Sequence, residues 1–192
     1  MAVLIRAAVA ADVPVITALQ NALLATTAIE WTDAEHSIED RAAWLEAHDR
    51  RGDAVLVAVD DALGDGGTSD GGTGHPGTGE VVGFAAYGDF RDSERWPGYR
   101  LTVEHTVHVA ESHWGTGVGR TLVEALIEHA ASAGKHVMVA AIDGANEGSI
   151  RFHQRLGFTE VARMPEVGTK FGGWLTLVML QRMIGSGHPP AG

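Results

Sequence analysis

Three glycines at alternate positions, Gly115, Gly117 and Gly119, separate a strand-like segment from a long amphipathic helix. Segment 103–109 alternates its side chains as a strand does, and Leu122 opens a row of apolar residues at helical spacing. Glycine lets the backbone approach a ligand closely, and the first turn of a helix presents N–H groups that lack a partner within the helix. The sequence therefore predicts a site for an anion such as a pyrophosphate, in a fold where a strand leads directly into this helix.

Two common phosphate-binding patterns do not fit this turn. The P-loop pattern GxxxxGK[ST] fails because position 114 is Trp and Arg120 stands where the lysine belongs. The dinucleotide pattern GxGxxG fails because Arg120 also occupies the place of its last glycine. We therefore do not assign the turn to either kind of nucleotide-binding loop.

A second pattern follows a buried strand-like run and reads Asn146-Glu-Gly-Ser149-Ile-Arg-Phe152-His153-Gln-Arg-Leu-Gly157-Phe158. Ser149 and His153 are four residues apart, so on a helix they share one face. The short amide of Asn146, at the end of the preceding strand, is placed to bond a ligand amide.

The two stretches resemble the acyl-CoA site of the GCN5-related N-acetyltransferases. That family carries [QR]xxGx[GA] after a strand, matched by Trp114-Gly-Thr-Gly117-Val-Gly119 with Trp114 in place of Gln or Arg. It also carries NxxSxxF[YH]xxxGF, which segment 146–158 matches without a gap. The resemblance implies an α/β fold with a central mixed, twisted β-sheet flanked by helices, and acetyl-CoA as the acetyl donor.

The resemblance also implies which residues bind acetyl-CoA. Strand backbone near Val107 and Val109 is expected to polarise the thioester oxygen and to pair with the pantetheine, whose amide Asn146 is expected to bond. The full implied set is Val107, His108, Val109, Trp114, Gly115, Thr116, Gly117, Val118, Gly119, Arg120, Asn146, Ser149 and His153.

Further stretches resemble the branch of the family that acetylates phosphinothricin and methionine sulfoximine or sulfone, and this resemblance covers nearly the whole chain. It implies a small amino-acid-like acceptor, detoxification as the benefit, and a homodimer. Two departures are a longer loop from Asp89 to Arg100 and the varied pair Glu30-Trp31. The stretches are Thr26-Thr-Ala-Ile29, Thr102-Val-Glu104-His105-Thr-Val-His-Val109, Lys135-His-Val-Met-Val-Ala-Ala141 and Gly168-Thr-Lys170-Phe-Gly-Gly-Trp174.

Two residues are candidates for catalysis. An α-amine is mostly ammonium at neutral pH, so a base must take a proton from it. Glu104 is our candidate, because the resembled family proposes this Glu as the base; a simple ion pair with a nearby Arg is the alternative. His153 stands where many members place a tyrosine, which is offered as the acid for the CoA thiolate; the alternative is a residue that only contacts CoA.

The acceptor's carboxylate calls for a cation. Arg91 is the best partner by chemistry, because a guanidinium can bind both carboxylate oxygens. Trp96 and Tyr99 are candidates to cover the acceptor, beside Glu104, and Arg100 and Lys170 are alternatives for the anion contact.

Composition excludes several other functions. The chain has 192 residues, with 14 Lys+Arg against 25 Asp+Glu and a net charge of −11, which argues against nucleic acid or an anionic membrane as a partner. The absence of cysteine excludes disulfides and thiolate metal sites. His105 and His108 would point to opposite faces of a strand, so we predict no metal site. No targeting segment is recognised, and we expect a cytoplasmic protein.

The chain reads as one domain over residues 1–184. Residues 61–80, rich in glycine, are predicted to be a flexible hairpin tip between two strands, and residues 185–192 a disordered tail. Strands are expected at 3–9, 54–59, 81–87, 103–109, 136–142, 158–164 and 174–183. Helices are expected after Asp12, after Ser37, after the glycine turn and over 149–156.

Three functions remain open on the sequence. The leading one is acetyl transfer to a small amino acid or analogue. The second keeps acetyl-CoA but takes a polyamine or a protein N-terminus as acceptor. The third is a non-catalytic sensor that binds acyl-CoA, which would predict loss of the base, whereas Glu104 is present.

Overall fold

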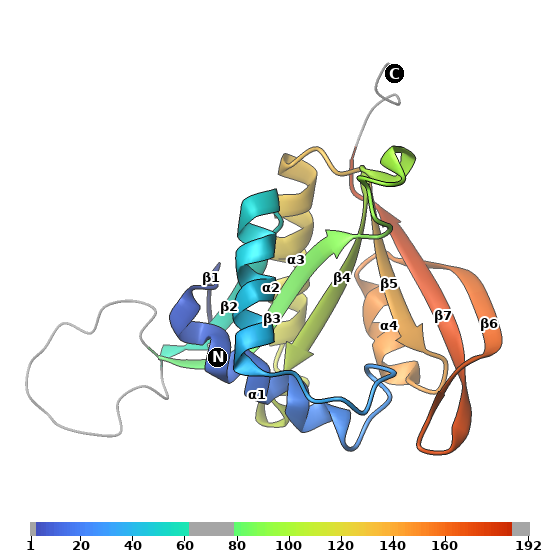
Figure 1. Cartoon of the computed structure of the whole chain (residues 1–192), viewed down its shortest axis with the longest axis horizontal. Coiled ribbons are helices and arrows are strands. Elements are labelled where there is room, and N and C mark those ends of the chain that lie inside the picture. Colours follow the sequence, from blue (N-terminus) through green and yellow to red (C-terminus); the bar gives the residue numbers. More distant parts are fainter. Residues whose placement is uncertain (1–2, 62–78, 186–192) are drawn as a thin grey trace, which may run out of the picture. The chain divides into compact units, whose positions relative to one another are not determined.

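The structure is a computed structural model that describes residues 3–61 and 79–185 (Figure 1). Over these residues the strands hydrogen-bond in the order β1-β2-β3-β4-β5-β7-β6. β4 and β5 are parallel, whereas the pairs β1/β2, β2/β3, β5/β7 and β6/β7 are antiparallel, so the predicted mixed α/β sheet is confirmed.

The elements have the following bounds. The strands are β1 (Leu4–Ala7), β2 (Val55–Asp60), β3 (Glu80–Asp89), β4 (Thr102–Val109), β5 (Val137–Asp143), β6 (Thr159–Lys170) and β7 (Gly173–Met183). The helices are α1 (Val13–Leu24), α2 (Ile38–Arg51), α3 (Val118–Ser132) and α4 (Glu147–Arg155), with short 3-10 turns η1 (Ala10–Asp12), η3 (Pro97–Tyr99) and η4 (Glu111–His113).

The chain divides into two compact units. The first comprises Met1–Leu23, Glu35–Ala86 and Val107–Leu126, and the second comprises Leu24–Ala34, Tyr87–Thr106 and Ile127–Gly192. β3, β4 and α3 each run from one unit into the other. Most of the predicted hairpin tip, residues 62–78, and the predicted tail from residue 186 lie outside the described residues. The single domain over residues 1–184 stays a prediction.

In the first unit, β1, β2 and β3 form an antiparallel meander, with Val57 opposite Phe84. The apolar faces of these strands enclose Ile16 of α1, and Trp44 of α2 packs against the same cluster. α2 begins as predicted at Ser37, whose Oγ accepts a hydrogen bond from the Asp40 N–H at 3.0 Å. The helix is terminated by Gly52, whose φ of 71° lies in the left-handed region that residues with a side chain rarely adopt.

A helix follows Asp12 as expected, but the Asp12 carboxylate does not cap it. This carboxylate instead makes two hydrogen bonds with the Arg6 guanidinium, at 2.7 and 2.8 Å, and accepts one from the Val9 N–H at 2.8 Å. The carboxylate therefore closes the η1 turn in front of the helix. A bidentate guanidinium is a stronger partner than a helix amide, which explains the difference.

In the second unit, β5 pairs with β7 from Val137–Met183 to Asp143–Leu177. α4 packs against β5 and β6 and begins two residues earlier than predicted, because the Asn146 side chain accepts from the Ser149 N–H at 3.0 Å and caps it. β6 is longer than predicted and continues to Lys170, with two irregularities in its register against β7. Within residues 3–61 and 79–185, no helix has the length and apolar character that crossing a membrane requires.

Candidate active site

The glycine turn lies in the first unit, between η4 and α3 (Figure 1). Gly115 has φ 74° and Gly117 has φ 97°, a left-handed conformation that side chains rarely adopt. An added Cβ would meet nothing within 4 Å at either position, so backbone conformation, and not lack of space, requires glycine there. Gly119 is already the second residue of α3.

Side chains next to the turn fix its backbone. The indole N–H of Trp114 donates to the Val109 carbonyl at 2.7 Å, and the Thr116 hydroxyl donates to the His113 carbonyl at 2.7 Å. Trp114, at the position where the family has Gln or Arg, therefore ties the turn to the end of β4. The buried His113 in turn lies 3.4 Å from Asp60 at the end of β2, a contact that the sequence did not signal because the two residues are 53 apart.

The start of α3 has the chemistry of an anion site. The Thr121 N–H bonds back to the Gly117 carbonyl at 3.0 Å, whereas a helix provides no internal acceptor for the N–H groups of its first residues, Val118, Gly119 and Arg120. The partial positive charge of a helix N-terminus adds to these donors. The Arg120 side chain donates to Glu124, one turn further along α3, at 2.8 Å.

β4 supplies backbone to the same unit through Val107, His108 and Val109. The His108 ring is buried and stacks on Phe84, with ring centres 4.9 Å apart and planes 10° apart. The predicted contribution of His108 to cofactor binding is therefore limited to its backbone. Val107 and Val109 are half-buried.

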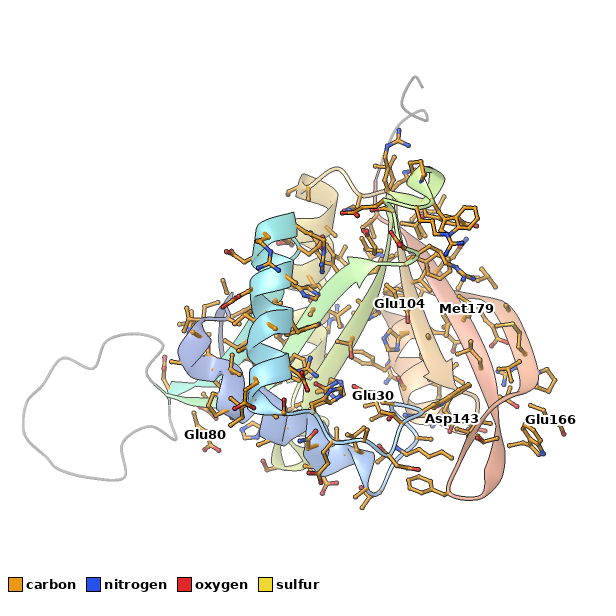
Figure 2. The ribbon with its side chains drawn as sticks, viewed as in Figure 1. Glu30, Glu80, Glu104, Asp143, Glu166 and Met179 are labelled. Carbon is orange, nitrogen blue, oxygen red and sulfur yellow. The ribbon has the colours of Figure 1, made fainter. Side chains whose placement is uncertain are left out.

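Glu104 and Arg91 lie within the second unit, and their charges interact. Glu104 is half-buried on β4 (Figure 2), and burial raises the pKa of its carboxyl, while the positive charge of Arg91 works in the opposite direction. Arg91 is exposed, with its guanidinium carbon 5.4 Å from the centre of the Phe90 ring. The structure thus brings the predicted base and the predicted carboxylate partner into one electrostatic neighbourhood.

The aromatic candidates lie on the same loop as Arg91. Trp96 precedes η3 and Tyr99 belongs to it; both are exposed, and the Tyr99 ring centre is 6.0 Å from that of Phe90. Arg100 is also exposed and donates to the Pro97 carbonyl at 3.1 Å. Trp96 and Tyr99 are therefore accessible, as a cover for an acceptor requires.

Lys170, the alternative anion contact, is placed differently. Its side chain is buried, and its ammonium donates to the carbonyls of Leu24 at 2.8 Å, Thr27 at 3.0 Å and Glu30 at 2.8 Å. An ammonium has three N–H groups, so none is left for a substrate carboxylate. We therefore assign Lys170 to holding the segment 24–30 and do not carry its substrate role forward.

α4 positions the remaining predicted residues. The Asn146 side-chain oxygen accepts the hydrogen bond that caps α4, while the residue is exposed and its amide N–H groups are hydrogen-bond donors. His153 is buried, and its Nδ1 lies 2.7 Å from the Ser149 carbonyl and 3.4 Å from the Ser149 hydroxyl. Ser149 and His153 thus share one face of α4, as predicted. Burial lowers the pKa of the His153 imidazole.

One residue of this cluster escaped sequence reasoning. His105 follows Glu104 on β4, and its Nδ1 lies 2.9 Å from the Val139 carbonyl of β5. Its Nε2 lies 3.2 Å from the Nε2 of His153. From the sequence, His105 was weighed only as a possible metal ligand. Among the described residues, no group of three or more potential ligands is placed to hold a metal ion.

The sequence pattern of the acetyltransferase (GNAT) family matches residues 18–158, which include the glycine turn, Glu104 and the whole 146–158 stretch. The chain belongs to the GNAT acetyltransferase family. The predicted family is thereby confirmed.

Relatives of this GNAT acetyltransferase span nearly its whole length. An L-methionine sulfoximine/L-methionine sulfone acetyltransferase of Pseudomonas paraeruginosa is 42% identical over 181 residues, 94% of each chain. A phosphinothricin N-acetyltransferase of Streptomyces coelicolor is 31% identical over 178 residues, 93% of this chain and 94% of that protein. Among solved structures, yncA of Salmonella typhimurium with its cofactor acetyl-CoA superposes with a TM-score of 0.86 at 39% identity, covering 100% of this chain and 99% of the other.

Proposed function

We propose that this acetyltransferase transfers the acetyl group of acetyl-CoA to the α-amine of a small amino-acid-like acceptor, such as methionine sulfoximine, methionine sulfone or phosphinothricin. The observation that carries the proposal is that the positive charge of exposed Arg91 acts on half-buried Glu104 and lowers the pKa that burial raises. A zwitterionic amino acid needs a base for its ammonium and a cation for its carboxylate. The names of the two relatives above support the same class of acceptor.

Acetyl-CoA supplies the acetyl group as an activated thioester. We propose that the backbone N–H groups at the start of α3 bind its pyrophosphate, since Gly115 and Gly117 already hold the turn in the conformation that glycine favours. The backbone of β4 from Val107 to Val109 and the amide of Asn146 are proposed to bind the pantetheine.

For the acceptor, Arg91 is proposed to bind the carboxylate with its guanidinium fork, and Trp96 and Tyr99 to cover the rest of the molecule. Glu104 then takes a proton from the ammonium, directly or through a water molecule. Burial favours this role, because a carboxylate with a raised pKa is a stronger base once ionised.

His153 is proposed to supply a proton to the CoA thiolate as the thioester bond breaks. Ser149 accepts at its carbonyl from the ring and so fixes the ring's orientation. A thiolate is a good leaving group, so we expect this acid to contribute less than the base. Detoxification of the acceptor, a homodimer and a cytoplasmic location are proposed from the family resemblance.

Release of the CoA thiol, read with a thiol-reactive dye across a panel of amines, tests the proposal. The panel contains methionine sulfoximine, methionine sulfone, phosphinothricin, ordinary amino acids, spermidine and a short peptide. Turnover confined to the amino-acid-like acceptors is the expected result. Turnover with only spermidine or peptide would replace the acceptor, and acetyl-CoA binding without any turnover would favour a sensor.

Arg91→Ala and Arg95→Ala form a matched pair for the acceptor site. Both side chains are exposed cations of one loop that lie against an aromatic ring, but only the charge of Arg91 reaches Glu104. Arg91→Ala should raise the KM for the amino-acid acceptor about tenfold or more, while Arg95→Ala should leave it within about twofold. An unchanged KM in Arg91→Ala would contradict the assignment.

A further inference from the structure

The rings of His105 and His153 face each other within the second unit, Nε2 to Nε2, at 3.2 Å. Both side chains are buried, with residue exposures of 8% and 4%. Phe158 lies against both rings, with ring centres 5.3 Å from His105 and 5.4 Å from His153, and Phe152 meets His153 edge-on at 4.9 Å. The pair therefore occupies largely aromatic surroundings.

The outer nitrogens decide how many protons the pair can carry. Nδ1 of His105 contacts the Val139 carbonyl at 2.9 Å, and Nδ1 of His153 contacts the Ser149 carbonyl at 2.7 Å. A carbonyl oxygen can only accept, so both Nδ1 atoms must carry hydrogen. A neutral imidazole has one N–H, so in two neutral rings both Nε2 atoms would be bare.

Two bare nitrogens 3.2 Å apart repel, and each is a buried acceptor without a donor. One added proton turns the same contact into an N–H···N hydrogen bond and satisfies all four ring nitrogens. A second proton would bury two like charges. Burial and the charge of His153 lower the pKa of His105 to about 4, and burial also lowers the pKa of His153, so a second proton on the pair is disfavoured near neutral pH.

Within the described part of the chain, the Ser149 hydroxyl is a further proton donor beside the pair, and its Oγ lies 3.4 Å from Nδ1 of His153. At 3.4 Å this hydroxyl is a weaker partner than the Ser149 carbonyl at 2.7 Å, so the groups that act most on the two rings are each other and the carbonyls of Val139 and Ser149. Glu104 is the neighbouring residue on β4, and adjacent residues of a strand point to opposite faces. The N–H···N contact is therefore decided by the two rings and their carbonyl partners.

We propose that His105 and His153 hold a single proton between their Nε2 atoms, and that this pair, and not His153 alone, is the acid of the proposed reaction. The proposal rests on the proposed function for its catalytic half. As the amine nitrogen bonds to the acetyl carbon, the C–S bond breaks with its electron pair on sulfur, and the pair's proton goes to that sulfur. The ammonium loses two protons over the cycle: one replaces the pair's proton and one leaves to solvent.

His105 thereby becomes a positioning residue. β4 and β5 pair in parallel at Thr102–Val137, Val103–Met138 and Glu104–Val139. His105 is the next residue of β4, and its Nδ1 bonds the carbonyl of Val139, the last paired residue of β5. The ring is thus held by the sheet, and it holds the His153 ring in turn. The proton affinity of His153 therefore depends on the His105 Nε2 that is held 3.2 Å from its own Nε2.

The proton itself is tested on the free, full-length protein by long-range ¹H–¹⁵N NMR with ¹⁵N-labelled histidine. Between about pH 6 and 7.5, both Nδ1 atoms should be protonated and the two Nε2 signals should lie between the protonated and bare positions. His105→Asn and His153→Asn assign the signals, and His136→Gln is the control that should leave them unchanged. Two bare Nε2 atoms throughout this range, or one ring with a bare Nδ1, would overturn the proposal.

The catalytic half is tested with two variants of His105. His105→Asn places an amide N–H near the position of Nδ1 and keeps the donor to Val139, but removes Nε2. We expect kcat to fall about tenfold, with a shifted pH profile and the KM for acetyl-CoA within about twofold. His105→Gln offers His153 a neutral donor without a proton to give, so it should not restore kcat.

Wild-type kcat and pH profile in His105→Asn would show that the bond to Val139 is all that His105 contributes, and would overturn the catalytic half. A shared proton in the NMR spectrum of an enzyme that acetylates none of the panel would leave the pair standing and refute the proposed function. The two failures are therefore distinguishable.

Discussion

At the scale of single residues, Glu104 is the side chain on which the proposed chemistry depends most. Glu104→Gln removes the base but keeps the size of the side chain. We expect kcat to fall roughly 10²–10⁴-fold, with the KM for acetyl-CoA little changed, because the amide cannot accept the ammonium proton. Steady-state kinetics with methionine sulfoximine measures this, and Glu94→Gln, on the exposed loop, is the control.

The pH dependence gives Glu104 a signature of its own. Because Arg91 lowers the pKa that burial raises, Arg91→Ala should move the acidic limb of the kcat/KM profile to higher pH. Near-wild-type turnover of Glu104→Gln over about pH 6 to 9 would remove Glu104 from the mechanism.

Residue roles were predictable where chemistry and position coincide, as for the glycines with positive φ and the Ser37 cap of α2. They were not predictable where a distant partner decides. Lys170 looked like a free cation, but carbonyls about 140 residues away in the chain use all its donors. His105 looked like an isolated strand residue until α4 placed His153 against it.

At the scale of elements, the end of β6 holds the segment 24–31. Gly168 faces the Trp31 ring so closely that an added Cβ would overlap its atoms Cε3 and Cζ3, and the Lys170 ammonium donates to three carbonyls of the same segment. Gly168→Ala should therefore displace Trp31, and Lys170→Met should remove the ammonium that donates to these three carbonyls. We expect each to lower the free energy of unfolding by about 1–3 kcal/mol, measured by urea denaturation.

The same hairpin supplies the control for these variants. An added Cβ at Gly173 would meet only the Lys170 carbonyl, at an ordinary 3.8 Å, so Gly173→Ala should be close to neutral. Wild-type stability and wild-type Trp fluorescence in Gly168→Ala would contradict the packing of Trp31.

The elements themselves were predictable from periodicity, and their ends less so. α2 begins after Ser37 in the structure as it was expected to from the sequence, because a serine cap is a local signal. β6 ran beyond its predicted end at 164, because β7 pairs with it through two irregularities in register that no local pattern reveals.

At the scale of the whole molecule, burial of histidine couples folding to pH. Burial lowers the pKa of His48 in the first unit and of His105 and His153 in the second, whereas an unfolded histidine titrates near 6.5. Below that pH the unfolded chain binds more protons than the folded one. The free energy of unfolding should therefore fall as pH falls from about 6.5 towards 5, by about 1.4 kcal/mol per pH unit for each excluded proton.

Glu104 contributes with the opposite sign, because a raised carboxyl pKa makes the folded state bind the extra proton, so the measurement is cleanest in Glu104→Gln. Urea denaturation across this pH range then measures how many more protons the unfolded chain binds than the folded one, from the slope of the free energy of unfolding against pH. If His105 and His153 keep one proton between them, the three histidines exclude about two protons, so the slope approaches about 2.7 kcal/mol per pH unit, and His48→Gln halves it. A slope near three protons would mean that the pair excludes both of its protons and that no proton is shared.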